Sequence, residues 1–88
     1  MIKRIILHWT AGRYYPSRFE KQYYHYLVDK DGRIYDGIFK PEDNNDCTDG
    51  KYAQHTGGGN TGSIGVAFCS MYGFKSRGNA GEYPITPI

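Results

Sequence analysis

The 88-residue sequence has few of the features that stabilise a chain covalently or anchor it in a membrane. Its two cysteines, Cys47 and Cys69, show no CxxC spacing and are too few for a disulfide framework, so we expect free thiols. No apolar run approaches the ~20 residues that cross a bilayer, and residues 1–7 are too short for the apolar part of a signal peptide. These absences predict a soluble chain without a membrane partner, synthesised in the cytoplasm.

Charge of one sign is also scarce. The formal net charge is +2, and the basic residues occur as scattered pairs rather than as the dense stripe that nucleic-acid binding requires. We therefore expect no nucleic-acid partner. Tyrosine, with nine residues, and glycine, with twelve, are abundant instead, and this composition suits the recognition of sugars, peptides or bases.

The length allows one small domain over residues 1–88, which buries only about 60–65% of the surface of its unfolded chain. Residues 2–9 are rich in isoleucine and predict a buried strand that ends at the TAG segment. Ser17 and Glu20 have the spacing of a capping box, which predicts one or two helical turns after Ser17.

The clearest local pattern is a β-hairpin. Two β-prone runs, residues 23–28 and 33–38, are joined through Asp31-Gly32, whose residues tolerate the positive φ of a tight turn. The polar residues 40–51 predict a surface loop, and residues 63–71 predict another buried strand, with Cys69 inside it, followed by a second loop. At the end of the sequence, Thr86 and Pro87 have the pattern of a helix N-cap and first helical residue.

Histidine occurs only three times. His8 lies near the end of the first predicted strand, His25 lies in the hairpin, and His55 precedes a glycine cluster. Taken alone, each histidine is more often structural than catalytic. His25 should point to the sheet face opposite its neighbours Tyr24 and Tyr26, because adjacent strand residues alternate, and we interpret it as structural.

The glycine-rich segment QHTGGGNTGSIGVAF, residues 54–68, allows three interpretations: a phosphate-binding loop, a flexible linker or the wall of a cleft. A P-loop is excluded because no GK[ST] follows and the segment continues into a strand. A linker is disfavoured because strand sequence resumes at once. We expect the glycines to let the backbone turn tightly and approach a ligand beside His55, with Asn60 fixing the loop through side-chain hydrogen bonds.

Three segments, in this order, resemble the N-acetylmuramoyl-L-alanine amidase type 2 family: ILHWTAG (6–12), YYHYLVDKDGRIYDG (23–37) and HTGGGNTGSIGV (55–66). That family includes phage endolysins and peptidoglycan-recognition proteins. The resemblance implies an α/β fold with a central mixed β-sheet. It also implies a zinc-dependent hydrolase that cleaves the amide between N-acetylmuramic acid and L-alanine of peptidoglycan, as a phage or prophage lysin acting at the bacterial cell wall after release.

The resemblance also implies roles for individual residues. His8 matches the first zinc-binding histidine, and Tyr24 matches the tyrosine that faces the metal and can hydrogen-bond a developing oxyanion. Zinc on neutral imidazole lowers the pKa of bound water to about 7 and polarises an amide carbonyl, which suits this reaction. The remaining matches are positions that line the substrate cleft: His55, Asn60, Trp9 and Thr10.

The sequence departs from the family in its metal ligands. Family members continue with a long helix and then a second zinc histidine and a cysteine or aspartate, whereas this sequence has no histidine after His55. Because catalytic zinc normally has three protein ligands, we expect the residues 1–88 to be an incomplete amidase domain. A site improvised from His8, His55 and a cysteine is a weaker alternative.

Two functional classes therefore stay open. In the first, the active enzyme takes its other ligands from the rest of the polypeptide or from another chain. In the second, the chain is a metal-free module that binds a muropeptide or another small ligand in the same cleft. The missing helix should leave an apolar sheet face uncovered, which favours self-association or, as a third possibility, docking on a partner chain as a regulator.

Overall fold

The computed structural model describes residues 1–76, 78–79 and 81–85, and the predicted helix start at Thr86 and Pro87 lies outside them. The elements in chain order are β1 (Arg4–Trp9), η1 (Glu20–Gln22), β2 (Tyr26–Val28), β3 (Ile34–Asp36), η2 (Pro41–Asn45) and β4 (Ser63–Phe68). Both η elements are short 3-10 helices. No helix in this part of the chain is long and apolar enough to cross a membrane.

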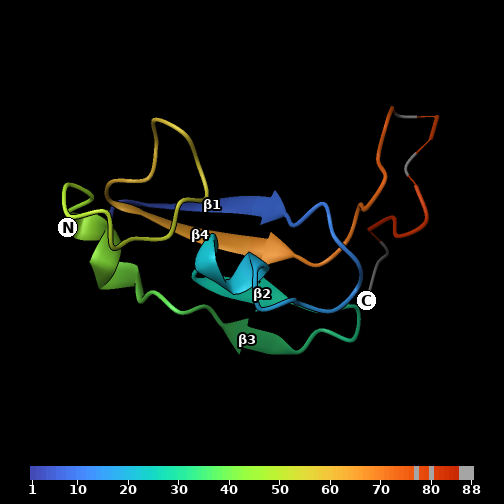
Figure 1. Cartoon of the computed structure of the whole chain (residues 1–88), viewed down its shortest axis with the longest axis horizontal. Coiled ribbons are helices and arrows are strands. Elements are labelled where there is room, and N and C mark those ends of the chain that lie inside the picture. Colours follow the sequence, from blue (N-terminus) through green and yellow to red (C-terminus); the bar gives the residue numbers. More distant parts are fainter. Residues whose placement is uncertain (77, 80, 86–88) are drawn as a thin grey trace.

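The four strands form one sheet in the order β1-β4-β2-β3. Strand β4 runs parallel to both β1 and β2, while β3 pairs antiparallel with β2 at the opposite edge (Figure 1). The expected central mixed sheet is therefore confirmed. Parallel pairing brings the carboxyl ends of β1, β4 and β2 to one side, from which the loops after β1 and β4 extend.

The two faces of the sheet differ in how far they are covered. On the covered face, the central strand presents only small residues, and Ser63, Gly65 and Ala67 are all buried. On the other face, Ile5 and Leu7 are each 66% exposed. The apolar face expected from the sequence is therefore open in the described residues, and self-association through it stays a prediction.

The predicted helical turn after Ser17 is confirmed as η1. The capping box forms in both directions: the Ser17 N–H donates to Glu20 Oε1 at 2.9 Å, and the Glu20 N–H donates to Ser17 Oγ at 3.1 Å. These two bonds satisfy backbone donors that the short helix leaves unpaired.

The predicted hairpin is confirmed, with shorter strands than expected. Gly32 has a φ of 86°, which explains the preference for glycine at this turn position. The Asp29 carboxylate organises the turn, since its Oδ1 accepts the N–H groups of Asp31 (2.8 Å) and Arg33 (3.0 Å) and its Oδ2 accepts the Tyr35 hydroxyl (2.9 Å). The backbone of Asp29 adds two more hydrogen bonds, because its N–H donates to the Arg33 carbonyl (2.9 Å) and its carbonyl accepts the Gly32 N–H (3.0 Å).

The stability of this hairpin should depend on pH through Asp29. Burial by itself raises the pKa of the carboxyl, but hydrogen bonds from the Arg33 N–H, the Tyr35 hydroxyl and the Asp31 N–H, with the Arg33 charge, bring it below its ordinary value. Because the folded pKa lies below the unfolded value of about 3.9, ionised Asp29 stabilises the fold above that value. This contribution is lost as the pH falls through the folded pKa.

We expect the Tm of Asp29→Asn to fall less than that of the wild type as the pH is lowered from about 5 to 2, because the variant has no carboxylate to protonate at this position. Thermal unfolding followed by circular dichroism measures the two profiles. Asp36→Asn, an exposed site in the same hairpin, controls for the loss of one charge. Parallel profiles for Asp29→Asn and wild type would contradict the role of this carboxylate.

Residues 40–51 differ from the surface loop that the sequence predicts. The segment contains η2, which begins with Pro41 and is capped where the Lys40 N–H donates to Asp43 Oδ2 at 2.8 Å. Within it Asn44 is completely buried. Asn44 Oδ1 accepts the Ala53 N–H at 2.9 Å, and Asn44 Nδ2 donates to the carbonyls of Ala53 (3.0 Å) and Asn60 (3.1 Å). A polar side chain thus joins η2 to the glycine-rich loop through the interior.

Candidate functional site

His25 is buried in the interior of the protein and is held there by two side-chain hydrogen bonds. It is 1% exposed, its Nδ1 accepts the Gly65 N–H at 2.9 Å, and its Nε2 lies 2.9 Å from Asn44 Oδ1. Because Nδ1 accepts, Nε2 carries the proton and donates to Asn44. Burial lowers the pKa of this imidazole, although the Asn44 bond and the nearby charges of Asp43 and Glu42 oppose the shift. With both nitrogens engaged, His25 has the structural role expected from the sequence.

His8, His55 and Thr56 form a compact cluster on the covered face of the sheet. His8 Nε2 lies 3.2 Å from His55 Nδ1, Thr56 Oγ1 lies 3.1 Å from His8 Nε2, and Thr56 Oγ1 lies 2.8 Å from His55 Nδ1. All three residues are half-buried. We call this group the histidine cluster. The structure thus brings together His8 and His55, which are 47 residues apart in the sequence.

The surroundings of the histidine cluster favour neutral imidazoles. Burial lowers the pKa of His8. Burial also lowers the pKa of His55, with further lowering by the nearby His8 and His25, against an opposing hydrogen bond to the Ser63 carbonyl. His55 Nε2 lies 3.3 Å from that carbonyl, which can only accept, so Nε2 carries the proton of the neutral ring. His55 Nδ1 therefore presents a lone pair toward His8 and Thr56.

Tyr24 stands beside the histidine cluster. Its ring centroid lies 5.5 Å from that of His8, and its hydroxyl makes a long hydrogen bond of 3.4 Å to the Trp9 carbonyl. Burial, with a contribution from the Glu20 carboxylate, raises the pKa of the phenol. The phenol is therefore a proton donor at neutral pH. Its weak bond to the backbone leaves it able to donate to a better acceptor.

Asn60 holds the loop that carries His55. Its Oδ1 accepts the Thr56 N–H at 2.8 Å, so the expected fixing of the loop by this side chain is confirmed. Gly58 and Gly62 have φ values of 76° and 72°, as the predicted tight turns require. The Asn60 side chain thus acts on the position of Thr56 and His55 through the backbone.

Trp9 and Thr10 lie apart from the histidine cluster. Strand alternation places the Trp9 side chain on the face opposite His8, where it is 45% exposed and its ring centroid is 5.6 Å from that of Phe74. Thr10 Oγ1 accepts the N–H groups of Gly12 (3.0 Å) and Ser70 (3.3 Å), so it links the loops that follow β1 and β4. Neither side chain joins His8, Tyr24 and His55.

Gly65 determines how closely His55 can approach the sheet. A Cβ on Gly65 would lie 2.6 Å from His55 Cδ2 and 2.8 Å from His55 Cβ, closer than real contacts allow. The imidazole therefore packs directly on the strand backbone at this position. At Gly65 the group that lies against the backbone is the His55 ring, and the close approach to a ligand expected of the glycines stays a prediction.

Gly65→Ala should destabilise the fold by about 1–3 kcal/mol, the usual cost of forcing an extra group into a packed site, and should displace the His55 ring from His8. Urea unfolding gives the stability, and the NMR shifts of the His55 ring report its position. Gly57→Ala serves as the control, because a Cβ there meets nothing within 4 Å. Unchanged ring shifts in Gly65→Ala would show that the packing does not hold His55.

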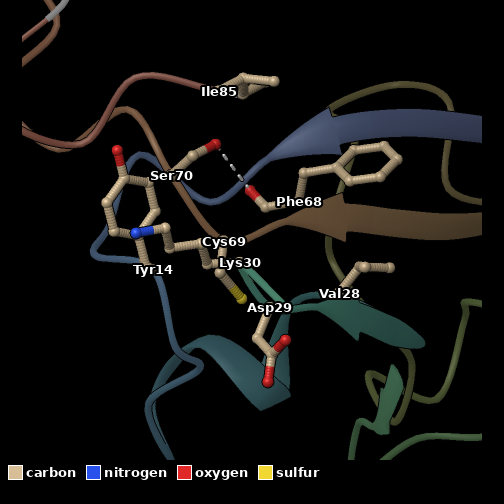
Figure 2. Close-up of a pocket in the computed structure, with 8 residues that line it drawn as sticks. All are labelled: Tyr14, Val28, Asp29, Lys30, Phe68, Cys69, Ser70 and Ile85. Carbon is tan, nitrogen blue, oxygen red and sulfur yellow. Dashed lines mark hydrogen bonds between the residues drawn. The ribbon is translucent and has the colours of Figure 1, made fainter. Parts of the chain in front are cut away.

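A small hollow lies at the carboxyl ends of β2 and β4, away from the histidine cluster. Its volume of about 30 Å³ is enough to hold a water molecule. Figure 2 shows Cys69 within it and the 3.2 Å bond from Ser70 Oγ to the Phe68 carbonyl at its side. Cys69 directly follows β4 instead of lying inside the strand as predicted, because regular pairing ends at Phe68.

Both cysteines are free, as expected, and neither joins the histidine cluster. Burial, with the nearby Glu20 and Asp29 charges, raises the pKa of the Cys69 thiol to about 12, so it stays protonated at neutral pH. Cys47 Sγ lies 3.9 Å from the Asn44 carbonyl in the η2 region.

The zinc ion that the resemblance implies needs three protein ligands. Within residues 1–76, 78–79 and 81–85, no group of three or more histidine, cysteine, aspartate or glutamate side chains could hold a metal ion. The alternative site of His8, His55 and a cysteine is therefore wrong for these residues. Two imidazoles are present, but the three protein ligands of a catalytic zinc centre are not supplied by the described residues alone.

A mixed sheet with neutral imidazoles and a protonated phenol on one face is an arrangement suited to hydrolytic chemistry. The family model for N-acetylmuramoyl-L-alanine amidase matches residues 1–87, and the chain belongs to that family. Membership indicates amidase activity on peptidoglycan in general. Comparisons with curated proteins and with solved structures found no match.

The sequence patterns did not identify two residues of the site, Thr56 and Asn44. Thr56 supplies the hydroxyl that contacts both histidines, and its position directly after His55 was the available signal. Asn44 orients His25 and the glycine-rich loop, but it lies in a polar segment with no pattern that marks one residue as buried.

Proposed function

We propose that the protein is a zinc-dependent N-acetylmuramoyl-L-alanine amidase, a phage or prophage lysin that acts at the bacterial cell wall. The observation that carries this proposal is the juxtaposition of His8, Tyr24 and His55 on the covered face of a sheet that matches the amidase family. The bond to be cleaved is the amide between the lactyl group of N-acetylmuramic acid and L-alanine.

In this proposal His8 would be one of the residues that hold a zinc ion, and the bound ion would supply Lewis-acid polarisation of the amide carbonyl. The other ligands of such a centre would come from another part of the polypeptide or from another chain. Neutral His8 suits this role, because a metal ligand needs an unprotonated nitrogen and burial lowers the pKa of its ring.

Tyr24 is proposed as the residue that stabilises the reaction's charge. When water adds to the amide carbon, negative charge develops on the carbonyl oxygen, and a phenol that keeps its proton at neutral pH can donate a hydrogen bond to it. The Tyr24 hydroxyl can give up its long hydrogen bond to the Trp9 carbonyl for a stronger, charge-assisted hydrogen bond to the oxyanion. Asn60 would shape the cleft wall by holding the loop, and Thr10 stays a proposed substrate contact at its margin. The contact proposed for Trp9 has no support from its side chain, which lies on the opposite face of the sheet.

Tyr24→Phe should lower kcat for peptidoglycan hydrolysis by about 10²–10³-fold, the usual effect of removing one oxyanion donor, with little change in KM. The rate of release of L-alanine amino groups measures both constants. Tyr23→Phe is the matched control, because Tyr23 packs on Phe19 rather than His8. A Tyr24→Phe enzyme with wild-type kcat would remove the proposed role.

The second candidate is a metal-free module that binds a muropeptide or another small ligand on the same face. The observation that favours it is the lack of a three-ligand metal group within the described residues. Calorimetric titration with a muropeptide separates the two functions. Binding that persists in a chelator, without hydrolysis when zinc is restored, supports the module.

A further inference from the structure

We propose that a hollow between η1, the segment after β3 and residues 50–54 is a subsite that binds one N-acetylated sugar unit of a glycan strand. The choice of a sugar rests on the proposed function, because that substrate carries N-acetylmuramic acid next to the bond that is cleaved. Sugar binding itself requires neither the histidine cluster nor hydrolysis. We call this hollow the aromatic hollow.

The aromatic hollow has the size and the side chains to hold one ring of a ligand. Its volume is about 240 Å³, somewhat below the roughly 300–1,000 Å³ of pockets that enclose a drug-sized molecule. Two half-buried aromatic residues, Phe39 and Tyr52, line it. Two exposed amides, those of Gln22 and Gln54, line it as well. Aromatic rings can pack on the C–H groups of a sugar, while an amide supplies an acceptor oxygen and two N–H donors for its hydroxyl and acetamido groups.

The charge of the lining favours a neutral ligand. All the side chains that line the aromatic hollow are uncharged at neutral pH. A larger hollow of about 420 Å³ shares Ile38 and Phe39 with it, but is also lined by Asp36, Lys40 and Glu42. A charged group of a ligand would find opposite charges in that larger hollow, whereas in the aromatic hollow it would lose water without gaining a charged partner. An uncharged sugar ring therefore suits the aromatic hollow better than a charged group does.

The walls of the aromatic hollow are held in place by hydrogen bonds of the protein itself. The Ile38 N–H donates to the Lys21 carbonyl at 3.0 Å, which joins the segment after β3 to η1. Ala53, which lies between two lining residues, is completely buried, and both its N–H and its carbonyl bond to the Asn44 side chain. A site that is formed before the ligand arrives loses less conformational freedom on binding.

The aromatic hollow adjoins the residues that are proposed to act on the substrate. Gln54 directly precedes His55, so their Cα atoms are about 3.8 Å apart, and Gln22 lies two residues before Tyr24. A sugar bound here would place its lactyl amide near the histidine cluster and Tyr24. Holding a substrate beside the groups that act on it removes part of the entropic barrier to reaction.

The test is an NMR titration of the ¹⁵N-labelled protein with tri-N-acetylchitotriose, an uncharged saccharide without a stem peptide. We expect the side-chain amides of Gln22 and Gln54 to shift along one saturable curve with a Kd of about 1 mM or below. The exposed side-chain amide of Asn79, in the loop after β4, should not shift. Shifts at Lys40 and Glu42 instead, or no shifts up to about 10 mM saccharide, would overturn the subsite. Hydrolysis of peptidoglycan by a protein that does not bind the saccharide would reject the subsite alone, and binding without hydrolysis would reject the amidase proposal alone.

Variants of the lining residues provide a second measurement. Tyr52→Ala should weaken binding of the saccharide at least about tenfold, the usual scale when an aromatic contact at a binding site is truncated. Gln54→Ala should weaken it about fivefold, the loss of roughly one net hydrogen bond, and it changes an exposed side chain that the fold does not need. Tyr15→Ala is the control, because Tyr15 is 53% exposed and its hydroxyl bonds to Asp31 in the hairpin. Amide NMR spectra establish which variants fold, and wild-type affinity in a folded Tyr52→Ala or Gln54→Ala protein would refute the proposal.

Discussion

Asn44→Ala is expected to lower the free energy of unfolding by about 3–5 kcal/mol, because it removes hydrogen bonds from several buried groups at once. The Asn44 amide serves the backbone N–H and carbonyl of Ala53 and the Nε2–H of His25. Ala53 is completely buried and His25 is 1% exposed, so bulk solvent does not reach the groups that lose their partner. This loss is a large fraction of the free energy of unfolding of a domain of this size.

Urea denaturation followed by tyrosine and tryptophan fluorescence measures this effect. Asn45→Ala is the matched control, since Asn45 is the exposed neighbour in η2 and its removal should change stability by less than about 0.5 kcal/mol. Equal unfolding midpoints for the two variants would show that the buried Asn44 network does not stabilise the fold.

The second large effect is expected on activity. His8→Ala should reduce the rate of peptidoglycan hydrolysis by roughly 100-fold or more. Loss of a residue that only hydrogen-bonds a metal ligand already lowers metal affinity or activity by about 10–100-fold, and loss of the ligand itself should have a larger effect. The fold should persist, since His8 is half-buried and β1 stays paired with β4 through its backbone.

Leu7→Ala is the control for this experiment. Leu7 neighbours His8 on β1, but its side chain points to the opposite face of the sheet and is 66% exposed. The Leu7→Ala variant should therefore hydrolyse peptidoglycan at a rate near that of the wild type. A folded His8→Ala protein that keeps a rate within tenfold of the wild type would contradict the ligand assignment.

Local signals predicted much of the fold because each specifies its own backbone geometry. Asp31-Gly32 supplied a positive φ at the hairpin turn, and Ser17 with Glu20 formed both bonds of the capping box. The isoleucine-rich residues 2–9 and the segment from Ser63 became the adjacent parallel strands β1 and β4. The pairing partner of each strand, by contrast, depends on contacts between distant segments.

The site was less predictable because it depends on tertiary contacts. His8 and Tyr24 came from family motifs, but the 3.2 Å approach of His8 to His55 depends on Gly65 leaving space for an imidazole. Asn44 was missed because polarity alone does not separate an exposed amide from one that is buried with all its bonds satisfied. Trp9 adjoins His8 in the sequence, yet strand alternation directs its side chain to the other face.

The central claim is that the protein cleaves the amide between N-acetylmuramic acid and L-alanine. The most direct measurement is to incubate the purified protein with peptidoglycan and Zn²⁺ and to identify the new chain ends by amino-group labelling and mass spectrometry. We expect new amino-terminal L-alanine without new reducing sugar ends. Reducing ends in place of free L-alanine, or intact peptidoglycan, would contradict it.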